Sequence, residues 1–187
     1  MSMTQSRPMT REQFLAWEEG QDLRWEFDGV NAHAMTGGTL AHARIQSNLN
    51  LELRLRLQGS SYMAYGSDFK VNTKIGYRYP DIHVTGRDMA PSAKMSDEPV
   101  ALFEVPSDST AREDRTKKLS AYLALTSVQH YVMLEQDIAL ATVMTRTATG
   151  WSIVVVDHTG AIALPALNIE LPMSAVYDGL TFEPALG

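Results

Sequence analysis

The distribution of apolar residues along the chain predicts most of its β-strands. Val100–Phe103 is apolar at every position, which is typical of a strand buried on both faces. In Leu23–Met35, Asp28-Gly29 separates two alternating apolar–polar runs, so this segment is predicted to form a β-hairpin. Further strands are predicted at residues 62–65, 69–73, 77–85, 130–134, 138–145 and 151–156.

The segment Leu40–Leu57 fits two patterns. Leucine alternates with polar residues from residue 49 onward, as in a strand, but apolar residues also recur every fourth position from Ile45. The length of the segment and its many helix-forming residues favour a helix to about Gln58, ended by Gly59. Such a helix is apolar over a wide arc, so we expect it to be heavily buried or to lie at a subunit contact.

Two other helices are predicted from their first residues. Thr10–Gln13 and Thr110–Glu113 both have the capping-box pattern, in which a Thr hydroxyl and an acid or amide three residues later satisfy free backbone N–H groups. Together with the strands, these helices predict an α/β or α+β fold, a mixed sheet with helices on its faces. Residues 1–9 are expected to form a flexible N-terminus, and residues 10–187 a single domain.

Composition removes several classes of function. The chain has no cysteine, which excludes disulfides, thiolate metal sites and a cysteine nucleophile. No apolar stretch is long enough for a membrane span, and the N-terminus lacks a signal-peptide core, so a cytoplasmic location is the default expectation. The net charge of −6 argues against general coating of nucleic acid, although a local basic groove is compatible with it.

Two acidic residues end or enter predicted core strands. Glu104 follows the buried run Val100–Phe103, and Asp81 lies on the strand predicted at 77–85. These strands are separated by one loop and are plausible sheet neighbours, although two such acids can also be unrelated surface groups. If the carboxylates converge, they form an oxygen-ligand site suited to Mg²⁺ or Mn²⁺. On the following helix, Asp114, Lys118 and Tyr122 share one face, and Lys118 is the candidate to orient and deprotonate a water molecule.

Short motifs spread over residues 9–157 occur in a characteristic order. They are Met9–Leu15, Trp25-Glu26-Phe27-Asp28-Gly29, Ala41-His42, Tyr79-Pro80-Asp81, Phe103–Thr110, and Asp114 followed by Lys118-Leu119-Ser120-Ala121-Tyr122. Together they resemble the motifs of the Uma-type putative restriction endonuclease family, part of the PD-(D/E)XK nuclease superfamily. The resemblance implies a restriction-endonuclease-like central sheet flanked by helices.

The same resemblance implies a metal-dependent endonuclease that hydrolyses DNA phosphodiester bonds. Asp81, Glu104 and the backbone carbonyl of Val105 would be ligands of Mg²⁺ or Mn²⁺, with Glu26 as an auxiliary carboxylate. Lys118 would replace the lysine that the superfamily usually carries two residues after the glutamate, where this chain has Pro106. Pro106 and Asp108 depart from the family pattern in the strand-to-helix loop.

Several assignments have alternatives. Glu26 can instead belong to a solvated strand face, and His42 can bind a phosphate or serve only in capping and packing. His83 faces the same way as Asp81, so it is either a metal ligand or proton shuttle or a satisfied buried imidazole. As a whole, the chain is either an active nuclease, a catalytically inactive nuclease-fold protein that binds nucleic acid or a protein partner, or a metal-dependent phosphatase. The apolar arc of residues 49–57 makes a homodimer plausible.

Overall fold

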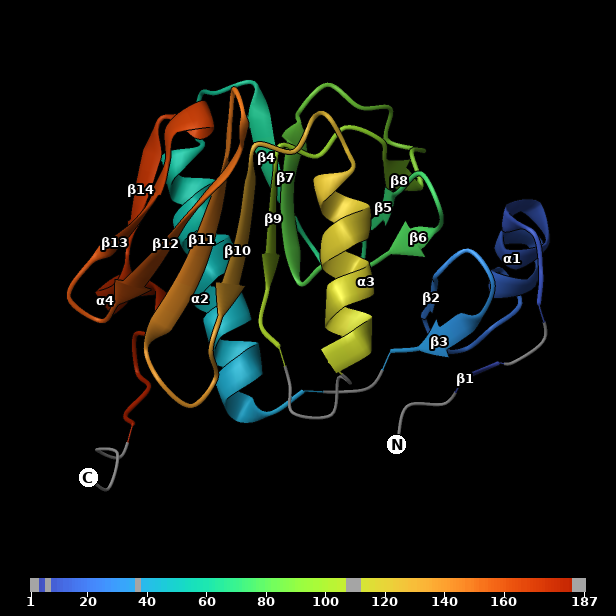
Figure 1. The fold of residues 1–187 in the computed structure, drawn as a ribbon, viewed down its shortest axis with the longest axis horizontal. Coiled ribbons are helices and arrows are strands. Elements are labelled where there is room, and N and C mark those ends of the chain that lie inside the picture. The colour runs from blue at the N-terminus through green and yellow to red at the C-terminus, as the bar shows by residue number, and fades with distance from the viewer. Residues whose placement is uncertain (1–3, 6–7, 36–37, 107–111, 183–187) are drawn as a thin grey trace.

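The computed structural model contains two six-stranded sheets, a two-stranded sheet and four α-helices in the residues it describes, which are 4–5, 8–35, 38–106 and 112–182 (Figure 1). The central sheet has the order β12-β11-β10-β9-β7-β4. Its strands β9 and β10 are parallel and all its other neighbours are antiparallel. They are β4 (Tyr62–Gly66), β7 (Ile82–Gly86), β9 (Ala101–Glu104), β10 (His130–Leu134), β11 (Leu140–Thr147) and β12 (Gly150–Asp157).

The second sheet has the order β1-β3-β2-β6-β5-β8. Its strands are β1 (Thr4–Gln5), β2 (Trp25–Phe27), β3 (Ala32–Ala34), β5 (Lys70–Asn72), β6 (Tyr77–Arg78) and β8 (Met95–Ser96). The predicted hairpin is confirmed, because β2 and β3 pair across Asp28-Gly29. The remaining strands, β13 (Ala161–Leu164) and β14 (Ile169–Pro172), pair with each other around a short 3₁₀ helix, Pro165–Leu167, and precede α4 (Met173–Val176).

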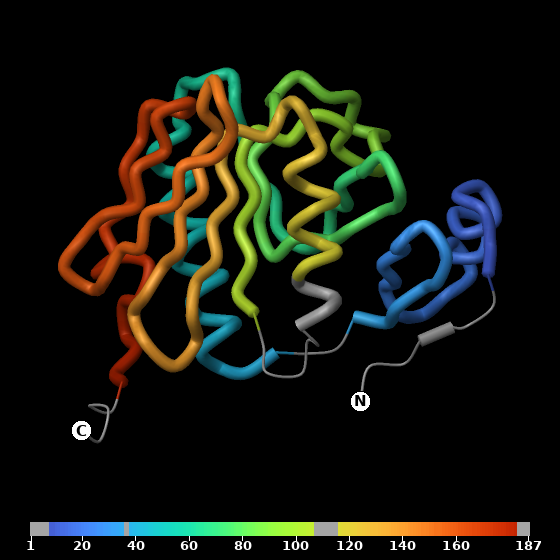
Figure 2. Tube along the Cα trace, in the orientation of Figure 1, coloured from blue at the N-terminus to red at the C-terminus, as the bar shows by residue number. Residues whose placement is uncertain are grey.

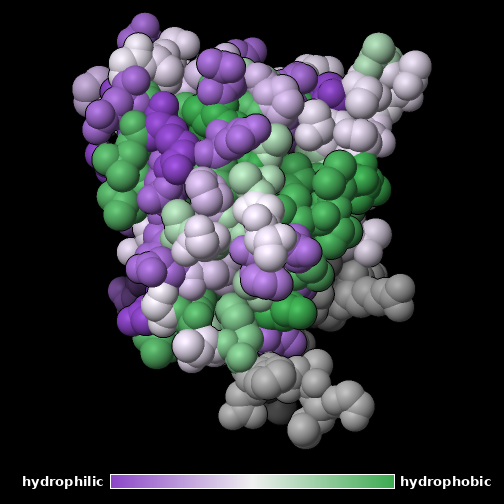
Figure 3. Space-filling model, turned by 90° about the vertical axis from the view of Figure 1, so that its left-hand side faces the viewer, coloured by the Kyte–Doolittle hydropathy of each residue, from purple (hydrophilic) through white to green (hydrophobic). Residues whose placement is uncertain are grey.

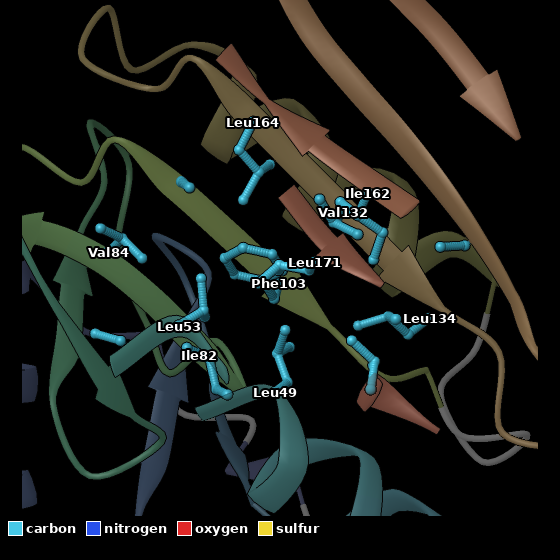
Figure 4. Close-up of a cluster of buried hydrophobic side chains, with 14 of the residues drawn as sticks. Leu49, Leu53, Ile82, Val84, Phe103, Val132, Leu134, Ile162, Leu164 and Leu171 are labelled. Carbon is cyan, nitrogen blue, oxygen red and sulfur yellow. The ribbon is translucent and has the colours of Figure 1, made fainter. Parts of the chain in front are cut away.

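Helices cover both faces of the central sheet (Figure 1). On one face, α2 (Leu40–Arg56) buries Ile45, Leu49 and Leu53 completely, as the four-residue ladder predicted. These side chains pack against the central strands and the β13–β14 hairpin (Figure 4). On the other face, α3 (Arg112–Leu123) packs Tyr122 into a smaller cluster that includes Leu102 of β9. The mixed α+β architecture expected from the sequence is therefore confirmed.

The first helix, α1 (Arg11–Glu18), begins with the predicted capping box. The Thr10 hydroxyl accepts a hydrogen bond from the backbone N–H of Gln13, and the Gln13 side chain accepts one from the N–H of Thr10. The second predicted capping box, at Thr110–Glu113, begins outside the described residues. No helix in the described part of the chain is long and apolar enough to cross a membrane.

The prediction of one strand over residues 77–85 is wrong. The segment forms two strands in different sheets, β6 before Pro80 and β7 after it. Proline has no backbone N–H and a fixed φ, so Pro80 ends one hydrogen-bonded ladder and lets the chain enter another. Two short strands lie outside the predicted elements: β8 follows β7 in the chain, and β1 lies within residues 1–9 and pairs with β3.

Candidate active site

Asp81 and Glu104 lie opposite each other at one end of the central sheet. In the antiparallel pair β7–β9, Ile82 is the partner of Phe103, and the register continued by one residue places Asp81 across from Glu104. The two carboxyl groups are close enough for the charge of Asp81 to raise the pKa of Glu104. The backbone N–H of Val105 donates a hydrogen bond of 2.7 Å to Asp81 Oδ2, which fixes the aspartate against the end of β9.

Residues in the first turns of α2 also contact Asp81. Nε2 of His42 lies 3.0 Å from Asp81 Oδ1, and the side-chain amide of Gln46 donates a hydrogen bond of 2.9 Å to the Asp81 carbonyl. The hydrogen bond to Asp81 raises the pKa of His42, although burial acts in the opposite direction. The N-terminal end of α2 and the chain leaving β9 lie at the same end of the sheet (Figure 2).

Glu104 is held by the helix on the opposite face. The Tyr122 hydroxyl donates a hydrogen bond of 3.0 Å to Glu104 Oε1. The pKa of the Glu104 carboxyl is raised to about 8, mainly by burial; Lys118 lowers it, and the neighbouring Asp81 and Glu26 carboxylates raise it. An acid with these neighbours is strained in its ionised form, and a bound cation would relieve that strain.

Lys118 points to this cluster and reaches Glu26. Its Nζ lies 2.9 Å from Glu26 Oε2, and only 16% and 6% of the two side chains are exposed. The other carboxylate oxygen of Glu26 accepts the backbone N–H of Tyr79 at 3.1 Å. Glu26 is thus a buried carboxylate, not part of a solvated strand face, and it fixes the ammonium group of Lys118.

Arg78 is a component of this network that the sequence analysis did not single out. Its guanidinium is completely buried and lies 3.5 Å from Glu26 Oε2. None of its nitrogens has a hydrogen-bond partner in the described residues. Only its position in the Tyr77–Tyr79 alternation could have drawn attention to it, and that pattern does not distinguish a buried from an exposed arginine.

His83 occupies a different environment from the other candidates. Its ring is fully buried and stacks against both Tyr65 and Phe69, with centroid distances of 5.8 and 5.7 Å. Neither ring nitrogen has a hydrogen-bond partner among the described residues, and burial lowers the pKa of the imidazole to about 4. The side chain of Asp114, also a candidate, lies outside the part of the structure that is described.

The donor set at Asp81 and Glu104 fits a hard divalent cation. Within the described residues there is no group of three or more His, Cys, Asp or Glu side chains that could hold a metal. Mg²⁺ does not need such a cage, since it is commonly bound through one or two carboxylates together with waters and substrate phosphates. Asp81, Glu104 and the carbonyl of Val105 could supply these contacts.

A cavity of about 480 Å³ opens beside Asp81. Its lining includes His42 and Gln46 from α2, together with Arg24 and Ser67. The cavity gives a path by which a polar substrate can approach the Asp81 carboxylate.

Comparison with known proteins identifies the family of this chain. The Uma2 family, described as "Putative restriction endonuclease", matches residues 11–174. The chain belongs to the Uma2 family. An uncharacterized protein of Synechocystis sp. is 28% identical to this Uma2 protein over 180 residues, which cover 93% of this chain and 94% of that one. The crystal structure of a putative nuclease of DUF820 from Anabaena variabilis has the same fold, with a TM-score of 0.75, 16% identity, and coverage of 91% of this chain and 98% of that chain.

Proposed function

We propose that this Uma2 protein is a metal-dependent endonuclease that hydrolyses phosphodiester bonds of DNA with Mg²⁺ or Mn²⁺. The observation that carries the proposal is the position of Lys118, whose ammonium group is fixed by Glu26 beside Glu104. A carboxylate pair with an adjacent ammonium group suits phosphodiester hydrolysis, because a bound cation and the ammonium group can stabilise the negative charge that develops on the phosphoryl oxygens. When bound, the cation would lower the pKa of a water molecule and neutralise charge on the phosphate.

The residues of the chain have distinct roles in this proposal. Asp81, Glu104 and the Val105 carbonyl hold the cation, and Lys118 orients the attacking water and stabilises the developing negative charge. Glu26 positions Lys118 and does not bind the cation, because both of its carboxylate oxygens already contact Lys118 and Tyr79.

A second group of residues positions the ligands or the substrate. Tyr122 orients Glu104 through its hydroxyl hydrogen bond, and His42 orients Asp81. His42 also lies in the first turn of a long helix and in the wall of the cavity, so it can donate a hydrogen bond to a substrate phosphate.

Cleavage of plasmid and single-stranded DNA in the presence of Mg²⁺ or Mn²⁺ tests the assignment. We expect Asp81→Asn and Lys118→Met each to lower the cleavage rate by at least about 100-fold, equivalent to a few kcal/mol of transition-state stabilisation. The matched controls are Asp68→Asn and Lys94→Met, whose side chains are 82% and 71% exposed, and they should retain the rate of the unmodified protein.

Two results would contradict the proposal. Cleavage that persists in both Asp81→Asn and Lys118→Met would show that other residues carry the reaction. A protein that cleaves neither substrate, and that binds neither ion in calorimetry, would instead be a nuclease-fold protein without catalytic activity.

A further inference from the structure

One edge of the central sheet is formed by the long strand β12. Its only partner in the described sheet is β11, and the pairing continues without a bulge from Thr147↔Gly150 to Leu140↔Asp157. The backbone N–H and C=O groups on the opposite side of β12 therefore pair with no strand among the described residues. Such a row is a template for the addition of another strand.

The side chains of β12 do not protect this edge. Ile153, Val154 and Val155 are 62%, 56% and 60% exposed, so both faces of the strand present β-branched apolar groups to solvent. Residues 151–156 contain no charge and no proline, the devices that usually prevent edge pairing. Helix α3 covers the middle of the sheet and leaves β12 uncovered on that face (Figure 1). Hydrophobic residues are exposed on the side of the molecule that is at the left in Figure 1 (Figure 3).

We propose that β12 pairs in antiparallel orientation with β12 of a second copy of this chain, about a two-fold axis at Val154. The two central sheets then form one continuous sheet across the dimer. This interface is independent of the proposed nuclease chemistry, since β12 lies at the opposite edge of the sheet from β7 and β4.

The first reason for a second copy is that the strand complements itself. In a register centred on Val154, Ile153 of each copy lies opposite Val155 of the other, on one face of the joined sheet. Val154 lies opposite its own counterpart on the other face. Cross-strand pairs of β-branched residues stabilise sheets, and here the symmetry makes every such pair occur twice or lie on the axis.

The second reason is charge complementarity at the two ends of the paired strands. The same register places Trp151 opposite Asp157 of the second copy. Arg146 is the β11 partner of Trp151, and its guanidinium lies 4.4 Å from the centre of the indole ring. Hydrogen bonds to the carbonyls of Leu123, Leu125 and Val128 hold that guanidinium in place.

Each Arg146 consequently faces an Asp157 carboxylate across a tryptophan, once at each end of the interface. Asp157 is the only charged residue of β12, so no like charges oppose each other in this register. A strand from an unrelated protein would have no such match built in. These contacts favour a copy of the chain as the occupant of the edge.

The rival surface is the solvent side of α2, where Leu51 and Leu55 are 57% and 50% exposed. Their backbone groups already make helical hydrogen bonds, so this surface offers side-chain contacts only. Arg54, between them in sequence, is exposed and would have to be accommodated at the contact. The edge of β12 adds main-chain hydrogen bonds to its apolar contacts.

Sedimentation velocity of the whole chain over a range of concentrations tests the interface. We expect a dimer for the unmodified protein and at least a tenfold weaker dimer for Val154→Lys, because the two lysines would oppose each other at the axis. Ile75→Lys is the matched control, since Ile75 is 51% exposed and lies outside the central sheet, and it should leave the dimer intact. Circular dichroism of each variant verifies that it is folded.

The absence of native cysteine allows a second, positional measurement. Under mild oxidation, Val154→Cys should form a disulfide-linked dimer much faster than Ile75→Cys. The proposal is overturned if the unmodified protein is a monomer at all concentrations, if Val154→Lys dimerises as well as the unmodified protein, or if Leu51→Lys dissociates a dimer that Val154→Lys does not. Equal cross-linking of the two cysteine variants would also overturn it.

Discussion

Two glutamate–lysine pairs lie on either side of Tyr79, and only one of them adjoins the candidate site. The Tyr79 backbone N–H donates to Glu26, which pairs with Lys118, while the Tyr79 hydroxyl donates to Glu18 at 2.8 Å, and Glu18 pairs with Lys70. The two pairs are similarly sheltered, with side chains 6–16% exposed in one and 10% exposed in the other. Burial alone therefore does not distinguish a candidate catalytic pair from a structural one.

The difference is in the charges that surround each pair. Lys70 lies over the rings of Tyr77 and Tyr79 and pairs with Glu18, so one positive charge balances one negative charge. The pair of Glu26 and Lys118 has further charged neighbours, namely the carboxylates of Asp81 and Glu104 and the guanidinium of Arg78. Burial, aided by the carboxylates of Asp81 and Glu26, raises the pKa of Glu104. The excess of carboxylates provides a place for a cation, which a balanced ion pair does not.

The largest expected effect separates the two lysines. Lys118→Met should lower DNA cleavage by about 100-fold, with a smaller effect on stability because Arg78 still accompanies Glu26. Lys70→Met should leave the cleavage rate of the folded protein nearly unchanged. It should lower the free energy of unfolding by about 2 kcal/mol, because Glu18 would remain sheltered without its cation.

Cleavage rates and urea denaturation of both variants measure these two effects. An equal loss of activity in the two variants, or a stability loss confined to Lys118→Met, would remove the distinction between a catalytic and a structural pair.

The next effect concerns pH and the excess of carboxylates. Burial raises the pKa of Glu104 from its ordinary value of 4.5 to about 8, so between these values the folded protein holds a proton that the unfolded chain releases. The contribution of Glu104 to stability is thus fully present below about pH 4.5 and is lost as the pH rises through about 8. Glu104→Gln should remove this loss, as measured by urea denaturation without divalent ions from pH 5 to 9.

Asp68→Asn, which changes an exposed carboxylate, serves as the control and should keep the pH dependence of the unmodified protein. Mg²⁺ should reduce the loss of stability above pH 7 in the unmodified protein but not in Glu104→Gln, since the cation would compensate the ionised carboxylate. Identical pH profiles for the unmodified protein and Glu104→Gln would show that Glu104 ionises as an ordinary acid.

Local periodicity was sufficient to predict most elements of the fold. The four-residue ladder from Ile45 gave the bounds of α2 to within a few residues, and the capping box at Thr10 gave the start of α1. The prediction failed at residues 77–85, where the apolar positions shift from Tyr77 and Tyr79 to Ile82 and Val84 across Pro80 and the two halves belong to different sheets. The two-residue strands β1 and β8 are too short to have a periodicity at all.

The candidate site was also predictable from the sequence only in part. The neighbouring positions of Asp81 and Glu104 follow from two consecutive strands of the central sheet, and Lys118 was selected by its place on a helix face. The surroundings of Glu26 depend on the pairing of β2 with β6, where Phe27 meets Tyr77 from a distant part of the chain. A single sequence contains no local signal for that contact, and Arg78 was missed for this reason.

The smallest effect compares two buried histidines, His83 and His130. Both are fully buried, and burial lowers the pKa of each to about 4. His130 Nε2 accepts the backbone N–H of Ala166 at 3.1 Å, whereas His83 has no hydrogen-bond partner in the described residues. His130→Leu should therefore lower the free energy of unfolding at pH 7 by about 1–3 kcal/mol, and His83→Leu should change it by less than about 1 kcal/mol.

The pH dependence gives the sharper test of His83. Its stabilising contribution is present above the ordinary pKa of 6.5 and is lost as the pH falls toward 4, because the unfolded chain takes up a proton that the folded protein excludes. Relative to the unmodified protein, His83→Leu should gain stability between pH 6.5 and 4, while its rate of DNA cleavage at pH 7.5 stays the same. A loss of Mg²⁺ binding or of cleavage in His83→Leu would instead make His83 a participant in the metal site with Asp81.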